Sequence, residues 1–231
     1  MPKVELIIFD CDGVLVDSEY LAAKISSELL TQIGYPISPE DLAERYAGLV
    51  FTDILKAIEP AYGKPISLQL VDRVEEEFRT RMHHELHAID GISQALISIM
   101  AHYPYCICSN SQQQSIHTML RIVGLADLFT TARIFSAPEV GSKRPKPAPD
   151  VYLFAAKQIR VPPAHCVVVE DSVYGVRSAV TAGMRVIGFT GGRHSYPGHA
   201  EVLSQAGAET TISHHKNLSP TIEAMAAWQN V

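Results

Sequence analysis

Two carboxylates stand two residues apart at the end of an apolar run, in the stretch FDCDGVLVDSE at residues 9–19. In extended backbone the side chains of Asp10 and Asp12 point the same way, while Cys11 points away from them. Carboxylates this close repel one another unless a cation lies between them or one of them holds a proton. Both arrangements serve catalysis, since one carboxylate can attack as a nucleophile while its neighbour carries protons.

Three other short apolar runs also end in polar residues. They are YCIC before Ser109, CVVV before Glu170 and Asp171, and RVIGF before a turn that starts at Thr190. Like the run VELIIF before Asp10, they do not alternate apolar with polar residues, which is typical of parallel strands buried on both faces. Ligands bind beyond the carboxyl ends of such strands, so we expect these polar residues to meet at one edge of a sheet.

Helical patterns lie between the runs, at residues 92–100, 111–123 and 172–182. The last of these ends at Gly183, a residue suited to a left-handed cap. Strand and helix in alternation predict an α/β fold with a Rossmann-like parallel sheet, covered by helices on both sides.

One stretch, residues 17–88, contains no buried strand. Its helical segments lie at residues 20–33, 39–47, 52–62 and 68–86. We therefore expect a smaller all-helical cap domain at residues 17–88, inserted after the first strand, and a core domain made of residues 1–16 and 89–231.

The oxygen ligands gathered at the predicted edge suit a hard divalent cation, Mg²⁺ above all. Asp10, Asp171 and a backbone carbonyl near Asp12 are the expected neighbours of that ion. Mg²⁺ commonly works beside substrate phosphates, and phosphoryl transfer also needs fixed donors and a cation around the transferring group. Ser109 and Lys146 can supply them.

Four motifs resemble, in order along the chain, those of the haloacid-dehalogenase superfamily of phosphohydrolases. They are DCDGVLV at residues 10–16, Ser109-Asn110, KPAPD at residues 146–150, and EDS at residues 170–172 with Gly175. The likeness spans nearly the whole chain. Within the superfamily, the sequence is similar to the subfamily of the β-phosphoglucomutases and phosphoglycolate phosphatases, whose members carry a helical C1 cap.

The resemblance implies a role for each motif residue. Asp10 is the nucleophile and Asp12 the general acid and base; Ser109, Asn110 and Lys146 bind the phosphoryl group; and Asp10, Asp12, Glu170 and Asp171 form the Mg²⁺ site, with Glu170 acting directly or through water. The resemblance also implies a hinge at residues 17–19 and a cap loop at residues 48–51 that reaches into the site. Lys143 and Arg144 are alternative candidates for the cationic role assigned to Lys146. Only the spacing to Pro147 and Asp150 favours Lys146.

Departures from related families narrow the chemistry. True dehalogenases of the superfamily lack the second aspartate, so Asp12 favours phosphate chemistry. No lysine stands in residues 47–53, where phosphonoacetaldehyde hydrolases form a Schiff base. Phe51 falls where β-phosphoglucomutases place an arginine for the far phosphate, which disfavours a mutase without excluding it.

The sequence therefore predicts an Mg²⁺-dependent phosphatase that hydrolyses a small phosphorylated metabolite, a sugar or sugar-acid phosphate. A phosphomutase on the same core is the alternative. A third hypothesis, an inactive binding protein, predicts a gap in the motifs, and none is present. Cap side chains set specificity, and Phe51, Arg79, Arg81 and His84 are the candidates.

Composition excludes other classes of partner. The formal net charge is −6, and basic residues are scattered, so no stripe exists for nucleic acid or an anionic membrane. The apolar run before Asp10 is shorter than a signal peptide's stretch of ~7–15 residues, and we expect a cytoplasmic protein. No protein partner is implied.

Three remaining features have plain interpretations. All four cysteines are expected to be reduced, because no secretory signal accompanies them. HHELH at residues 83–87 has one residue too few between its glutamate and last histidine for a metalloprotease zinc site. Gly191-Gly192-Arg193-His194 either borders the site or forms an ordinary glycine turn.

Overall fold

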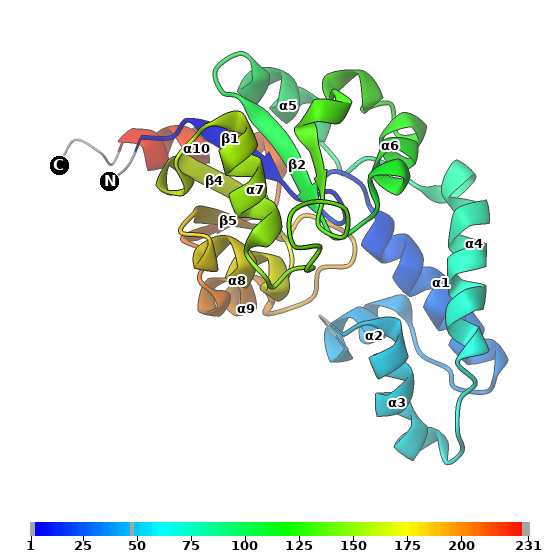
Figure 1. The fold of residues 1–231 in the computed structure, drawn as a ribbon. Coiled ribbons are helices and arrows are strands. Elements are labelled where there is room, and N and C mark those ends of the chain that lie inside the picture. Colours follow the sequence, from blue (N-terminus) through cyan, green and yellow to red (C-terminus); the bar gives the residue numbers. More distant parts are fainter. Residues whose placement is uncertain (1–2, 47–48, 228–231) are drawn as a thin grey trace.

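A parallel sheet forms the centre of the molecule. The computed structural model describes residues 3–46 and 49–227. Within them the strands are β1 (Leu6–Phe9), β2 (Tyr105–Ser109), β3 (Ile134–Ser136), β4 (Cys166–Glu170), β5 (Arg185–Phe189) and β6 (Thr210–Ile212). They lie in the order β3-β2-β1-β4-β5-β6, and every pairing is parallel. Figure 1 labels the four central strands, β2, β1, β4 and β5. The predicted Rossmann-like α/β fold is confirmed.

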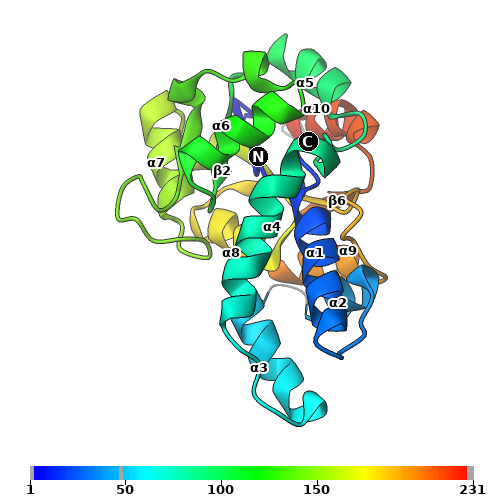
Figure 2. The same ribbon diagram turned by 90° about the vertical axis from the view of Figure 1, so that its right-hand side faces the viewer.

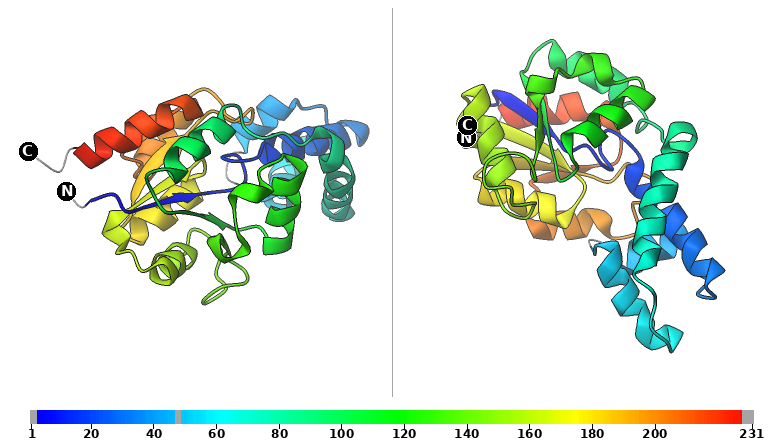
Figure 3. Two further views of the ribbon diagram at one scale, coloured as in Figure 1. Left: turned by 90° about the horizontal axis from the view of Figure 1, so that it is seen from above. Right: turned by 45° about the vertical axis from the view of Figure 1, so that its right-hand side comes forward.

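Helices cover both faces of this sheet. The first face carries α5 (Ile92–Met100), α6 (Gln113–Ile122) and α10 (Leu218–Ala227); the second carries α7 (Asp150–Ile159), α8 (Val173–Thr181) and α9 (His199–Ala206). In the left view of Figure 3, α10 (red) and α7 (yellow-green) lie on opposite sides of the strands. Ile7 and Phe9 of β1 belong to the first apolar layer, and Leu6 and Ile8 to the second. Burial of both faces explains why the strand sequences do not alternate.

The edge strands were not predicted. β3 and β6 are three residues long, and β6 reads TTI, with its two threonines half-buried. β3 reads IFS, and its two apolar residues are too few to form a recognisable run, while β6 has only one apolar residue. Short 3-10 helices complete the core at Ala126–Leu128, Thr131–Arg133, Pro163–His165 and His215–Asn217.

The insertion after β1 is helical. It contains α1 (Ser18–Gln32), α2 (Pro39–Arg45), α3 (Phe51–Tyr62) and α4 (Gln69–Glu85). α1 and α4 lie side by side and lead from the core to α2 and α3 (Figure 2). Ala47 and Gly48, part of the expected second segment and of the cap loop, lie outside the described residues. None of the described helices is long and apolar enough to span a membrane.

The chain crosses between the sheet and the inserted helices twice, and the two crossings lie together. Val16 forms a bridge with Ala88, and the backbone N–H of Asp17 donates to the carbonyl of His87 at 2.9 Å. These crossings support a division at residues 17 and 88, which stays a prediction.

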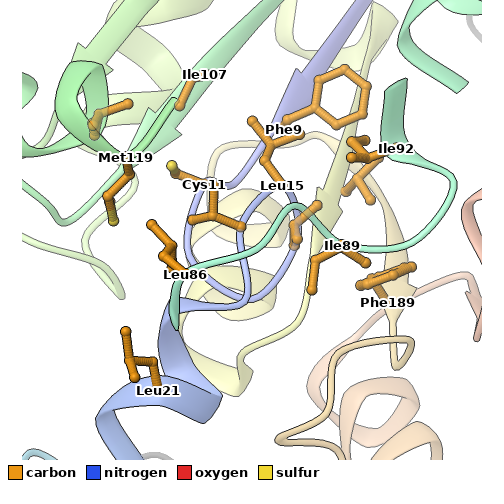
Figure 4. Packing of buried hydrophobic residues seen from close by; sticks show 14 of the residues in the cluster. Phe9, Cys11, Leu15, Leu21, Leu86, Ile89, Ile92, Ile107, Met119 and Phe189 are labelled. Atoms are coloured by element: carbon orange, nitrogen blue, oxygen red, sulfur yellow. The ribbon is translucent and has the colours of Figure 1, made fainter. Parts of the chain in front are cut away.

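One continuous apolar cluster joins the sheet to the inserted helices. Cys11 is fully buried in it, near Leu21 of α1, Leu86 beyond α4 and Met119 of α6 (Figure 4). The thiol therefore lies in the apolar layer. All four cysteines are free and buried, in agreement with the expected reduced state.

His215 forms a hydrogen bond with the segment that follows β1. Its ring stacks on Phe189 at a centroid distance of 4.2 Å, and its Nε2 donates to the carbonyl of Val14 at 2.8 Å. The residue is 1% exposed. Burial lowers the pKa of His215 to about 4.

This histidine makes stability depend on pH. Between pH 6.5 and about 4, His215 is protonated in the unfolded chain and neutral in the folded chain. The free energy of unfolding therefore falls as the pH falls through this window. A shift of this size corresponds to about 3 kcal/mol. We expect the loss of unfolding free energy between about pH 7 and about pH 4.5 to be smaller by about 2–3 kcal/mol in His215→Phe.

Urea unfolding at the two pH values measures the effect. His102→Phe, at an exposed site before β2, is the matched control and should keep the pH dependence of the parent. An equal pH dependence in His215→Phe and the parent would contradict the assignment.

Candidate active site

The site lies where the direction of strand order reverses. β1 is flanked by β2 and β4, which come from different parts of the chain. Asp10 directly follows β1, Asp171 directly follows β4, and Ser109 is the last residue of β2. Residues far apart in sequence therefore meet at the carboxyl edge, at the position where open α/β sheets bind ligands.

Three buried carboxylates form the centre of this edge. Ligand atoms of Asp10, Glu170 and Asp171 all lie within 4.8 Å of one another. Burial and the charge of Glu170 raise the pKa of Asp10 well above its usual value, and burial also raises the pKa of Glu170. Among the described residues no other group of histidine, cysteine or acidic side chains has metal-site spacing, so the sequence HHELH forms none.

Lys146 is the cation that faces these acids. Its Nζ lies 2.6 Å from Asp10 Oδ1 and 2.9 Å from Glu170 Oε2, and its side chain is 3% exposed. Although burial opposes its charge, Asp10 and Glu170 raise the pKa of Lys146. Asn110, expected to bind phosphate, accepts at Oδ1 from the Lys146 backbone N–H at 2.8 Å. The competing Lys143 and Arg144 are exposed.

Glu170 differs from the other two acids because both its oxygens have protein donors. Besides the lysine, the hydroxyl of Tyr152 donates to Oε2 at 3.0 Å, and the hydroxyl of Ser172 donates to Oε1 at 2.6 Å. None of the described side chains donates to Asp10 Oδ2. Asp10 and Asp171 thus keep oxygen capacity for a cation, whereas Glu170 contributes mainly charge.

Asp12 is held by hydroxyl groups outside the three-acid cluster. Ser18 donates to its Oδ1 at 2.7 Å, and Ser111 and Ser109 donate to its Oδ2 at 2.8 and 3.1 Å. Ser18 begins α1, so Asp12 is tied to the first inserted helix as well as to the loop after β2. Nothing in the sequence marks Ser18 or Ser111 as residues of the site, because serines at helix starts are common caps.

The glycine-rich loop after β5 borders the site. His194 Nε2 lies 2.8 Å from Asp171 Oδ2. The next residue toward the N-terminus, Arg193, pairs with Asp17 and lies over the ring of Tyr20, with its Cζ 4.0 Å from the ring centroid. Of the two interpretations of Gly191-Gly192-Arg193-His194, the structure favours a border of the site.

The four cap candidates differ in their surroundings. Arg81 is held between Glu28 and Glu85, at 2.6 and 2.7 Å, and so joins α1 to α4. Phe51 begins α3 and packs partly into the apolar cluster. Arg79 is exposed, and His84 lines a cavity at the hinge. Of the four, Arg81 therefore has the clearest structural role, which is to link α1 to α4 through its ion pairs.

A parallel sheet with helices on both faces and an acidic cluster at its carboxyl edge is the arrangement of an α/β enzyme whose site lies at that edge. The chain belongs to the haloacid dehalogenase-like hydrolase family, whose model matches residues 7–189. The resemblance noted from the motifs is confirmed.

Individual relatives agree with this membership. A haloacid dehalogenase-like protein of unknown function from Agrobacterium tumefaciens is 48% identical, with a TM-score of 0.92 over 96% of this chain and 99% of that chain. A family hydrolase from Deinococcus radiodurans, solved with bound phosphate and sodium, is 31% identical, with a TM-score of 0.86 and 98% of both chains covered. The 6-phosphogluconate phosphatase of Escherichia coli is 29% identical over 198 residues, 85% of this chain and 87% of the relative.

Gly13 provides a test of the cluster's close packing. Its φ is +74°, and a Cβ there would lie 1.9 Å from Asp171 Oδ2. Gly183 has a φ of +76° but no atom within 4 Å of such a Cβ. Alanine at either position adopts a strained left-handed conformation that costs about 1–2 kcal/mol. Only Gly13→Ala also displaces Asp171.

We expect Gly183→Ala to keep the parent's rate of phosphate-ester hydrolysis. Gly13→Ala should lose at least about 100-fold, as displaced catalytic groups commonly do. Steady-state rates and urea unfolding of the two variants separate loss of the site from loss of stability. Equal rates in the two variants would contradict the packing argument.

Proposed function

We propose that this protein is an Mg²⁺-dependent phosphatase of small phosphorylated metabolites, acting on sugar or sugar-acid phosphates through an aspartyl-phosphate on Asp10. The observation that carries the proposal is the position of Asp10 at the end of β1, 2.6 Å from a buried lysine and beside two further buried acids. The activity for which the Escherichia coli relative is named and the phosphate bound in the Deinococcus radiodurans structure support it.

The residues present fit the metal. Three buried carboxylates with oxygens this close need a cation, and oxygen ligands are those that Mg²⁺ prefers. Asp10 and Asp171 would hold the ion, together with the backbone carbonyl of Asp12, and Glu170 would act through its charge or through water. Bound Mg²⁺ supplies positive charge beside the phosphoryl oxygens.

Hydrolysis takes two displacements at phosphorus. Asp10 first attacks phosphorus and forms a new P–O bond, while the bond to the substrate's alcohol oxygen breaks and Asp12 donates a proton to that oxygen. Asp12 then accepts a proton from water, whose oxygen attacks phosphorus, and this second displacement releases inorganic phosphate and restores Asp10. Three hydroxyls hold the Asp12 carboxylate in one orientation for both transfers.

Three side chains can bind the transferring phosphoryl group. Lys146 would stabilise the negative charge of the phosphoryl oxygens. Because its ammonium group already lies beside Asp10, little reorganisation would accompany the reaction. The Ser109 hydroxyl, which donates to Asp12 here, is placed to donate to a phosphoryl oxygen instead. The amide nitrogen of Asn110 is also available, because its oxygen anchors the Lys146 backbone.

Removal of the nucleophile tests the mechanism. Asp10→Asn keeps the size of the side chain and loses the charge that attacks phosphorus, so we expect turnover to fall by at least about 10³-fold. Asp127→Asn, at an exposed site, is the matched control and should keep the parent rate. Phosphate release is measured for both variants, and circular dichroism checks that both fold. Full activity of Asp10→Asn would rule out the aspartyl-phosphate.

A panel of sugar and sugar-acid phosphates tests the reaction class. With Mg²⁺ we expect stoichiometric release of inorganic phosphate from some members, without a bisphosphate primer, and loss of the reaction in EDTA because three unbalanced acids then face the substrate phosphate. Simultaneous assays of free phosphate and of isomerised sugar phosphate decide between classes. An isomerised product that needs a bisphosphate would favour the mutase, and no turnover on any member would favour a binding protein.

A further inference from the structure

Two histidines of one segment contact Asp171, and the mechanism above uses neither. His194 belongs to the loop after β5, and His199 is the first residue of α9. One contacts the Asp171 side chain and the other its backbone. Among the described residues, neither histidine forms a hydrogen bond or an ion pair with Asp10 or Lys146.

His199 fixes the backbone of Asp171. Its Nε2 lies 2.7 Å from the Asp171 carbonyl oxygen, and its Nδ1 lies 3.2 Å from Ser195 Oγ. Because a carbonyl only accepts, the ring proton is on Nε2 and the Ser195 hydroxyl donates to Nδ1. The residue is 5% exposed, and its ring stacks on Tyr196 at 4.7 Å.

His194 contacts the carboxylate itself. The separation of its Nε2 and Asp171 Oδ2 is 2.8 Å, although the direction of approach lies off the line of an ideal hydrogen bond. Two glycines confine the ring: a Cβ on Gly192 would lie 2.4 Å from its Cε1, and a Cβ on Gly13 would lie 2.8 Å from the same atom. The side chain is 13% exposed. The imidazole ring therefore has little room to move and lies against Asp171 Oδ2.

We infer that His194 is a positioning residue for the proposed metal ligand Asp171: its contact with Oδ2 restricts rotation of the carboxylate and leaves Oδ1 to bind the cation. The inference rests on the proposed Mg²⁺ site. A carboxylate without such a partner turns freely about its last side-chain bond and loses entropy when it binds a cation. Partners of this kind, one step away from the ion, typically change metal affinity by ~10–100-fold.

The alternative is that the ring only fills space between the glycines. A hydrocarbon ring fills the same space without a buried nitrogen, and burying an uncompensated polar group is costly. Neither ring nitrogen has a well-aligned hydrogen-bond partner among the described residues, but Nε2 lies 2.8 Å from a carboxylate oxygen, whereas Nδ1 has no such contact. The contact of Nε2 with Asp171 is what a space-filling role leaves unexplained.

Calorimetric titration with Mg²⁺ alone, without substrate, tests the inference on the full chain. His194→Phe keeps the ring and removes the polar contact, and we expect its Mg²⁺ affinity to be ~10–100-fold weaker than that of the parent. His194→Gln can still donate to Oδ2 and should bind Mg²⁺ more tightly than the Phe variant. His102→Phe, at the opposite end of the strands, should bind Mg²⁺ as the parent does.

Equal Mg²⁺ affinity of His194→Phe and the parent would overturn the inference. If the Phe variant does not fold, His194→Ala removes the same contact without adding bulk and carries the same expectation. If the parent binds Mg²⁺ and releases phosphate, and the His194 variant binds Mg²⁺ with the same affinity, only the positioning role is refuted. A parent that binds no Mg²⁺ would refute it together with the metal assignment.

Discussion

Negative charge concentrated in a buried place is the constraint on which the site depends. Asp10, Glu170 and Asp171 lie within 4.8 Å of one another, and burial makes their mutual repulsion stronger than it would be in water. Lys146 offsets part of this charge by contacting two of the three acids. One lysine cannot balance three ionised carboxylates, so either a further cation or a proton on one of the acids must offset the remaining charge. The proposed Mg²⁺ is such a cation.

The strand order explains how the chain brings these charges together. Because β1 lies between β2 and β4, the ends of these three strands, where Asp10, Ser109 and Asp171 stand, are direct neighbours. The sheet itself is buried on both faces by apolar layers that involve no charged side chain of the site. A rigid apolar support allows the polar edge to hold groups at short distances, which loops alone would not maintain.

The parts of the fold that follow from strong local patterns could be predicted from the sequence. Four buried strands, the helical insertion and the acids at strand ends were of this kind, because each combines an apolar run with an abrupt polar end. β3 and β6 lack such a run, since each is three residues long at an edge of the sheet. The contacts of Ser18 and His194 were also beyond prediction. Neither residue type is unusual in a loop or helix start, and only the fold brings them to Asp12 and Asp171.

Adjacent residues after β5 connect the catalytic edge with the inserted helices. His194 contacts Asp171, while Arg193 pairs with Asp17 and lies over Tyr20 of α1. Asp17 is also the residue at which the chain crosses out of the core. A movement of α1 relative to the sheet would therefore pull on the segment that holds the Asp171 carboxylate. Ser18 makes the same connection on the other side, because its hydroxyl holds Asp12 from the first residue of α1. Asp12 and Asp171, which lie on either side of Asp10 in the proposed site, are thus oriented partly by contacts that start at α1, so their geometry depends on the position of that helix.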